Sequence, residues 1–268
     1  MLTLKRYQLQ GLFNMKKLKF LLLTAMCLFC VSAHAQEPII EKKQNRFLLL
    51  LSSYKRPMLL SGQILRLMNQ TYTDFTLSVS IKGTPQEWIK STFFKEWQPF
   101  INQKRLYIRF DENKEQLSNL LDTARNFDIS KYDYFCKIDD DDWYAPTYLE
   151  ETNNWLNQEK DIDLSMTRNA ILLENGNEAV VMRVNETTLA GPTMCFSQKV
   201  IKSLFALEKN PRALVPLYPE KEVIKRKAKQ EDALIHHMTE KIGKVQYRHS
   251  IKENIIYGKQ YPSVTRPN

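Results

Sequence analysis

The fold is decided by residues 47–80, which run FLLLLSSYKRPMLLSGQILRLMNQTYTDFTLSVS. Phe47–Ser52 is a continuous apolar segment, as expected for a strand that is buried on both faces. The apolar residues of Met58–Asn69 recur at helical spacing, and Thr76–Ile81 predicts a second strand. A strand, a helix and another strand in this order indicate two parallel strands joined by a crossover helix.

The same alternation continues beyond this stretch. Strands are predicted at Leu106–Phe110 and Tyr134–Ile138, with helices from Thr84 to about Trp97 and over Glu115–Asn126. Shorter elements follow: strands at Leu164–Thr167, Ala170–Glu174, Val180–Val184 and Met194–Phe196, and helices from Ser197 and over Glu231–Ile242. The pattern predicts a single α/β domain, in which a mostly parallel sheet carries helices on both faces and binds ligands at the carboxyl ends of its strands.

The composition is that of a globular protein, since 43% of the 268 residues are hydrophobic and 26% are charged. The formal net charge of +9 is concentrated at the start, because residues 1–35 hold five lysines and arginines and no acid. The remaining 233 residues carry 34 basic and 30 acidic residues, a net charge of +4. This excess is too small to indicate a nucleic-acid partner.

Residues 15–38 have the pattern of a secretory signal, MKKLKFLLLTAMCLFCVSAHAQEP. Lysines precede an apolar run that is shorter than the roughly 20 residues of a bilayer-spanning helix, and small residues stand at Ala33 and Ala35. We therefore predict a leader over residues 1–35, a mature chain that begins at Gln36, and a secreted or periplasmic protein. An uncleaved leader would instead hold the chain at a membrane surface.

Cleavage would leave two of the four cysteines, Cys136 and Cys195, which lie 59 positions apart. Two cysteines do not make a disulfide framework, and free cysteines are commonly buried. We interpret both as small buried side chains rather than as a bridge or a metal site.

Four aspartates, Asp139 to Asp142, follow directly after the predicted strand at Tyr134–Ile138. Adjacent carboxylates repel one another, so a cation or bound protons must compensate them at the end of a buried strand. Carboxylate oxygens suit Mg²⁺, Mn²⁺ or Ca²⁺. Alternation along an extended segment would turn Asp139 and Asp141 to the same side. The alternative is a solvated acidic turn that caps the next helix.

Several short segments occur in a fixed order along the chain. They are Tyr54-Lys55-Arg56-Pro57, the turn Gln70-Thr71-Tyr72, Ala124-Arg125-Asn126, KIDDDDWYAP from Lys137, GPTMCFSQKVIKSL from Gly191, and Glu231-Asp232. This ordered set resembles the family 2, GT-A type, glycosyltransferases. The resemblance places a GT-A-like domain at residues 46–250, after a polar lead at 36–45 and before a C-terminal tail at 251–268.

The resemblance implies an inverting enzyme that uses Mn²⁺ or Mg²⁺ and moves a hexose from a nucleotide-sugar donor to a hydroxyl of a glycan or glycolipid. Polysaccharide or lipopolysaccharide biosynthesis is the expected setting. Where the family has an acidic residue that reads the nucleotide base, this chain has Ser80-Ile81-Lys82-Gly83, which leaves the base open.

The resemblance also assigns roles to individual residues. Asp232 would be the catalytic base, and the start of a helix favours the ionised form of an acid there. The other roles are donor binding by Tyr54, Arg56, Arg125 and Asp139, metal binding by Asp139, Asp141 and His249, and acceptor contacts by Gly191, Glu231 and Trp143.

The leader conflicts with this activity, because nucleotide sugars are cytosolic in bacteria and an exported enzyme would lack its donor. The alternative hypothesis is a secreted, non-catalytic carbohydrate-binding protein on a GT-A scaffold. A secreted domain that binds calcium as a structural ion, without transfer activity, is a third.

Overall fold

The computed structural model describes residues 43–54, 56–83, 85, 88, 92–111, 116–167, 169–174, 178–183, 193–210, 231–248 and 255–259. The chain divides into two units, Met1–Lys42 and Lys43–Asn268, and every described residue belongs to the second. The predicted leader, Gly191 and His249 lie outside the described residues. Among the helices in the described ranges, none is long and apolar enough to cross a membrane.

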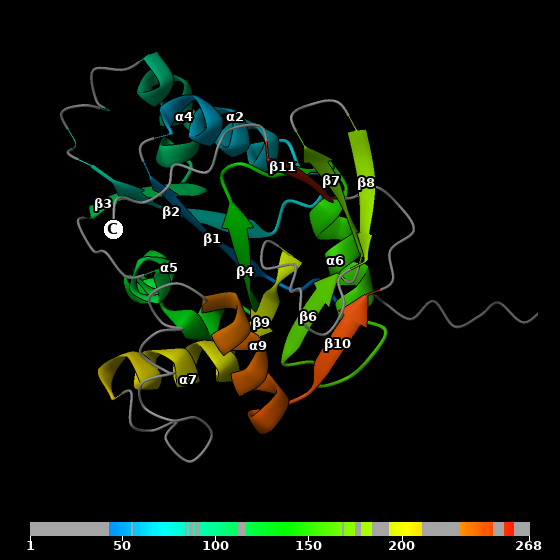
Figure 1. Cartoon of the computed structure of the whole chain (residues 1–268). Helices are drawn as coiled ribbons and strands as arrows, with labels where there is room; N and C mark the ends of the chain where they lie inside the picture. The colour runs from blue at the N-terminus through cyan, green and yellow to red at the C-terminus, as the bar shows by residue number, and fades with distance from the viewer. Residues whose placement is uncertain are drawn as a thin grey trace, which may run out of the picture. The chain divides into compact units, whose positions relative to one another are not determined.

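The main sheet contains seven strands: β1 Phe47–Tyr54, β2 Phe75–Lys82, β3 Leu106–Asp111, β4 Tyr134–Asp139, β6 Leu164–Thr167, β9 Cys195–Ser197 and β10 Val245–Arg248. Their order is β10-β6-β9-β4-β1-β2-β3 (Figure 1). β1 pairs in parallel with β2 and β4, and β2 with β3. β9 runs antiparallel to its neighbours β4 and β6. The predicted α/β class with a mostly parallel sheet is confirmed.

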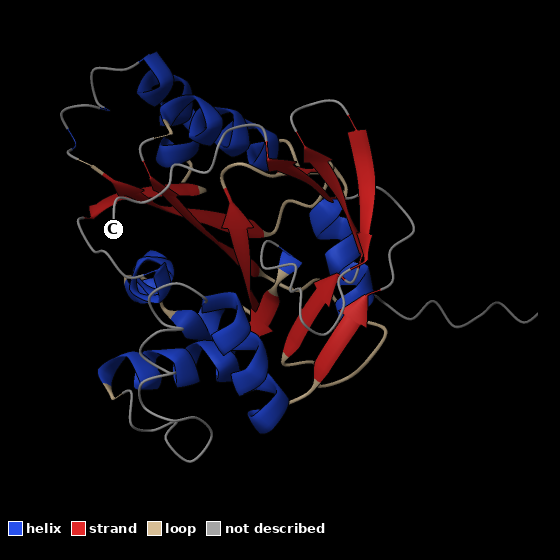
Figure 2. Cartoon of the chain, viewed as in Figure 1, coloured by secondary structure: helices blue, strands red, loops and turns tan. Residues whose placement is uncertain are grey.

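Helices cover both faces of this sheet (Figure 2). One face carries α2 (Pro57–Met68), α4 (Thr92–Asn102) and α6 (Tyr148–Leu156), and the other carries α5 (Gln116–Arg125), α7 (Gln198–Lys209) and α9 (Glu231–Ile242). Successive side chains of β1 alternate between the two cores, with Leu49 and Leu51 in the first and Leu48 and Leu50 in the second. Burial on both faces explains why this strand is continuously apolar.

A second sheet contains β5 (Trp143–Tyr144), β7 (Asn169–Glu174), β8 (Glu178–Arg183) and β11 (Ile255–Lys259), in the order β5-β11-β7-β8. The sequence predicts β7 and β8 as short strands but not their separation from the main sheet. This separation depends on β11, which pairs with β5 and β7 from a distant part of the chain.

Most predicted elements differ from the observed ones by one or two residues at their ends. The largest difference is in α4, which was predicted from Thr84 to about Trp97 and is observed at Thr92–Asn102, past Pro99. Phe100 and Ile101 still pack against the first core, and their burial outweighs the hydrogen bond lost at the proline.

Cys136 and Cys195 form a disulfide, so the prediction of two unpaired cysteines is wrong. The register of β9 against β4 places Cys195 directly opposite Cys136. Both residues are buried, as expected. A separation of 59 residues carries no information on strand register, which is why the sequence did not reveal the bond.

Candidate active site

The carboxyl ends of the parallel strands meet at one edge of the main sheet. β1 ends at Tyr54, β2 at Lys82 and β4 at Asp139. The register sets Ser52 level with Asp139 on one side and with Ser80 on the other. This is the edge at which open α/β sheets bind their ligands, and the predicted acidic run lies on it.

Three of the four aspartates form a compact group. β4 ends at Asp139, and the chain then turns through Asp140 to Asp142. Carboxylate oxygens of Asp139, Asp141 and Asp142 all lie within 4.8 Å of one another, and we call these three residues the acidic cluster. The expectation that Asp139 and Asp141 lie together is confirmed, and Asp142 joins them. A donor set made only of carboxylates fits Mg²⁺ or Mn²⁺.

Asp140 is the most buried member of the run, with 4% of its surface exposed. The hydroxyl of Ser53 on β1 donates to its carboxylate, and a guanidinium nitrogen of Arg56 lies 3.2 Å away. Burial raises the pKa of Asp140 to about 6, although Ser53 and Arg56 act in the opposite direction. Asp140 therefore joins the turn after β4 to the end of β1.

Arg56 supplies positive charge to the acidic run. It directly precedes α2, and its Nη1 donates to Asp141 at 2.5 Å while lying 3.2 Å from Asp140. The Arg56 side chain therefore supplies part of the positive charge that the four carboxylates require. Tyr54, also predicted to bind the donor, lies at the end of β1, and the ammonium of Lys82 is 5.6 Å from the centre of its ring.

Lys137 is a site residue that the sequence reasoning missed. It lies on β4 two positions before Asp139, so both side chains project from the same face of the strand. Its Nζ is 3.2 Å from Asp139 Oδ1 and 2.8 Å from Asp232 Oδ1, and 6% of its side chain is exposed. The available signal was a lysine within the apolar strand YFCKI, immediately before the acidic run.

Asp232 is the second residue of α9, and its carboxylate reaches Lys137 on β4. The structure thus brings the predicted base to the same edge as the acidic cluster. Burial raises the pKa of Asp232, Lys137 lowers it and Asp139 raises it further. The net effect is a raised pKa, whereas the start of a helix was expected to favour the ionised form.

Arg125 is the predicted site residue that the structure places elsewhere. It ends α5, the crossover helix between β3 and β4, which returns toward the edge where the strands begin. Its guanidinium donates to Asp122 at 2.7 Å and to Glu208 of α7 at 2.8 Å. The side chain joins α5 to α7, and the structure does not bring it to the acidic cluster.

The predicted acceptor side is described only in part. Trp143 begins β5 directly after the acidic cluster and is half-buried. Glu231 begins α9, and its backbone precedes Asp232. A further polar group faces the interior near this edge: the hydroxyl of Ser80, level with Ser52, is buried without a hydrogen-bond partner among the described residues.

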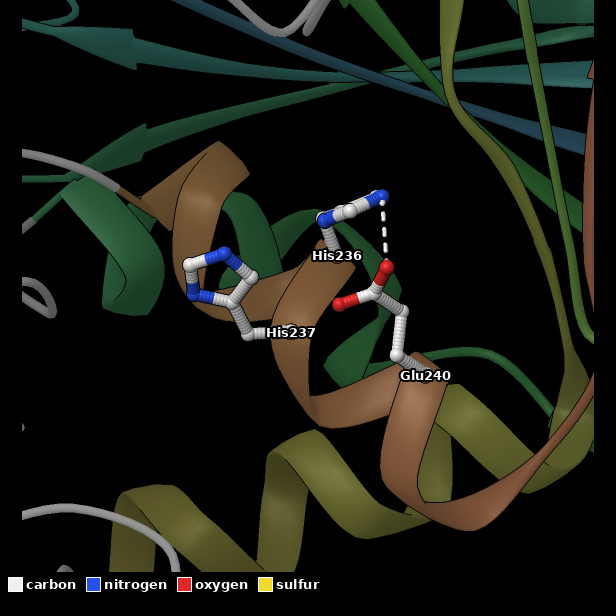
Figure 3. A group of neighbouring side chains, drawn as sticks. All are labelled: His236, His237 and Glu240. Atoms are coloured by element: carbon white, nitrogen blue, oxygen red, sulfur yellow. Dashed lines mark ion pairs between the residues drawn. The ribbon is translucent and has the colours of Figure 1, made fainter. Parts of the chain in front are cut away.

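A second group of possible ligands lies further along α9, at His236, His237 and Glu240 (Figure 3). Nε2 of His236 hydrogen-bonds the Tyr247 hydroxyl at 2.6 Å and lies 3.6 Å from the Glu240 carboxylate. Burial lowers the pKa of His236, which favours the neutral ring. These contacts of His236 join α9 to β10.

Comparison with known proteins identifies the fold. No protein-family model and no curated protein matches the sequence. S. aureus TarS 1–349 in complex with UDP-GlcNAc matches with a TM-score of 0.54 and 13% identity, over 81% of this chain and 59% of that chain. The mannosyltransferase PcManGT from Pyrobaculum calidifontis, in complex with GDP-Man and Mn²⁺, matches with a TM-score of 0.55 and 12% identity, over 83% and 59%.

The chain thus spans about 60% of the length of these solved chains. The shared feature at such low identity is the architecture, a mostly parallel sheet between two layers of helices. This chain has the α/β fold of the GT-A glycosyltransferases.

Proposed function

We propose that the protein is a glycosyltransferase that moves a hexose from a nucleotide-sugar donor to a hydroxyl of a glycan or glycolipid. The observation that carries this proposal is the acidic cluster at the carboxyl end of β4, on a fold shared with proteins that bind UDP-GlcNAc and GDP-Man. A solvated acidic turn would not need cationic partners from the protein, whereas this run is contacted by Arg56 and by the buried Lys137.

The acidic cluster would hold the divalent ion, with Asp139 and Asp141 as the principal ligands. A bound Mn²⁺ or Mg²⁺ would supply charge neutralisation of the leaving diphosphate. Arg56 contacts Asp141, and its guanidinium is positively charged, as the divalent ion is. When the ion binds, the two cations repel each other, so the guanidinium would have to share this carboxylate or leave it. Tyr54 and Lys82, at the ends of neighbouring strands, would flank the nucleoside of the donor.

Asp232 would accept the proton of the attacking hydroxyl in an inverting displacement. Its carboxylate stands at the edge of the sheet, with Oδ1 buried beside Lys137 while 29% of the side chain is exposed. Trp143 and Glu231 would lie on the acceptor side. Positioned proton transfer of this kind typically contributes about 10²–10⁴ in rate.

A donor screen tests the proposal. The chain from Gln36 is incubated with UDP- and GDP-hexoses, with and without Mn²⁺, and the release of nucleoside diphosphate is measured together with the shift in unfolding temperature. We expect one donor to give both a metal-dependent shift and slow release. Absence of both with every donor would contradict the proposal. The Asp141→Ala variant controls for hydrolysis by a contaminant.

We also propose that the domain works in an oxidising compartment, secreted or periplasmic if the leader is removed and at a membrane surface if it is kept. The buried Cys136–Cys195 disulfide supports this, because such bonds persist mainly outside the cytosol. The same bond favours the second candidate, a non-catalytic carbohydrate-binding protein. That protein would bind a glycan in the screen but release no nucleoside diphosphate.

A further inference from the structure

We propose that Lys137 is a positioning residue that holds the carboxylate of Asp232 beside the acidic cluster. The proposal rests on the proposed function, in which Asp232 is the base, and it names the group that fixes where this base stands. None of the motifs that resemble a known family assigned a role to Lys137.

The contacts of Lys137 form a bridge between two parts of the site. Its Nζ meets Asp139 on its own strand at 3.2 Å and Asp232 on α9 at 2.8 Å. With 6% of the side chain exposed, water has little access to replace either carboxylate. A buried ammonium requires such partners, and each partner in turn requires the ammonium, so the three charges depend on one another.

The helix that carries Asp232 is held in place by other contacts. Leu234, Ile235 and Met238 of α9 are buried in the second core, together with residues of α5 and α7. The position of the helix therefore does not depend on Lys137. The Asp232 side chain is in the first turn and is 29% exposed, so without Lys137 it is free to turn toward solvent. What Lys137 determines is the orientation of one carboxylate.

A lysine beside an acidic cluster has one other obvious use, which is to contact the donor diphosphate directly. The two uses predict different kinetics. A positioning residue affects the proton-transfer step and leaves donor affinity unchanged, whereas a diphosphate ligand affects donor affinity. The two can therefore be separated by measuring kcat and the donor KM for the same variants.

The kinetic test compares Lys137→Met, Asp232→Asn and the double variant, each in the chain from Gln36 with the donor found in the screen. We expect Lys137→Met to lower kcat on the order of 10²-fold with a donor KM within about three-fold of wild type. The double variant should be no slower than Asp232→Asn alone, because Lys137 acts through that carboxylate. Lys137→Arg should recover part of the rate.

A matched control is available on the surface. Lys131 lies 3.9 Å from Asp128, and both side chains are more than half exposed. Lys131→Met removes a lysine–aspartate contact on the surface, away from the site, so it should leave kcat and KM at their wild-type values. A tenfold weaker binding of UDP or GDP in Lys137→Met, with kcat unchanged, would overturn the positioning role.

A stability cycle tests the contact without any activity. Lys137→Met should lower the denaturation midpoint, since two carboxylates then lose their buried counter-charge, and adding Asp232→Asn should restore part of the loss. Lys131→Met combined with Asp128→Asn, an exposed pair, should show no such coupling. Additive effects at Lys137 and Asp232 would overturn the proposal. Coupling in stability with no transfer by the wild type would support the contact and overturn the proposed function instead.

Discussion

The two halves of the domain differ in how their strands are connected and paired. From β1 to β4, successive parallel strands are joined by helical crossovers, and each strand pairs with a neighbour that is close in sequence or with β1. After Asp139 the chain interleaves distant segments: β9 runs antiparallel between β4 and β6, and β11 returns to pair with β5 and β7. The acidic run is the boundary between the halves.

This difference also divides the candidate site. The first half supplies Tyr54, Arg56 and Asp139, the groups assigned to donor and metal, whereas the second half supplies Asp232 and Trp143 for the acceptor. Lys137 joins the two through its contact with Asp232. If the division is functional, changes at Tyr54, Arg56 and Asp139 should weaken donor binding, and changes at Asp232 and Trp143 should slow transfer alone.

The largest expected effect comes from Asp232→Asn, which should lower the transfer rate by about 10²–10⁴ because an amide cannot accept the proton of the attacking hydroxyl. Donor affinity should stay at the wild-type value, since the change lies in the second half. Initial rates with an identified acceptor, and nucleotide binding by calorimetry, measure both quantities. Glu231→Gln is the matched control and should cost less. Wild-type rates in both variants would place the base elsewhere and remove the division.

Loss of the disulfide should affect the junction between the halves. Replacing Cys136 and Cys195 with alanine removes the bond between β4 and β9, and such losses typically cost about 2–5 kcal/mol of unfolding free energy. Urea denaturation of the chain from Gln36, with and without reductant, measures this. Reductant should destabilise the wild type and have no effect on the double alanine variant. Equal stability of reduced and oxidised wild type would show that β9 is held in place by its other contacts.

The same contrast explains how much of the molecule the sequence could predict. In the first half, continuous apolar strands and helical periodicity identify every strand of the parallel sheet to within two residues. The acidic run could be identified from sequence because four aspartates directly after an apolar strand stand out in the local pattern. Asp139 and Asp141 lie together as expected.

In the second half the decisive facts are pairings. Whether Cys195 faces Cys136, and whether β7 belongs to the main sheet, depends on registers that no local pattern encodes. Arg125 was predicted to bind the donor because a local motif matched. In the structure its side chain contacts Asp122 and Glu208 instead, so a matching motif did not determine where the residue lies. Lys137 was missed because one charged residue in an apolar strand was taken as part of the strand.

At the boundary between the halves, Asp141→Ala should weaken metal-dependent nucleotide binding, with an affinity loss on the order of 10²-fold in the presence of Mn²⁺. Asp141 is partly exposed and pairs with Arg56, so the fold should survive its removal. Calorimetric titration of UDP and GDP with and without Mn²⁺ measures the effect, and Asp128→Ala, at an exposed turn, is the control. Unchanged Mn²⁺-dependent affinity would refute the assignment of Asp141 as a metal ligand.

The smallest expected effect is a change in pH dependence at Asp140. Burial raises the pKa of Asp140 from 3.8 to about 6, so its contribution to stability is full below about pH 4 and is lost as the pH rises through about 6. A shift of this size corresponds to at most about 3 kcal/mol at pH 7. Asp140→Asn removes the titration and can still accept from Ser53, so its unfolding free energy should vary less than that of the wild type between pH 4 and 7.

Asp128→Asn is the control of opposite sign, since hydrogen bonds from Ser130 lower the pKa of Asp128 and its contribution is lost as the pH falls. Equal pH profiles of the wild type and Asp140→Asn in urea denaturation would show that the pKa of Asp140 does not change on folding, and would contradict this prediction.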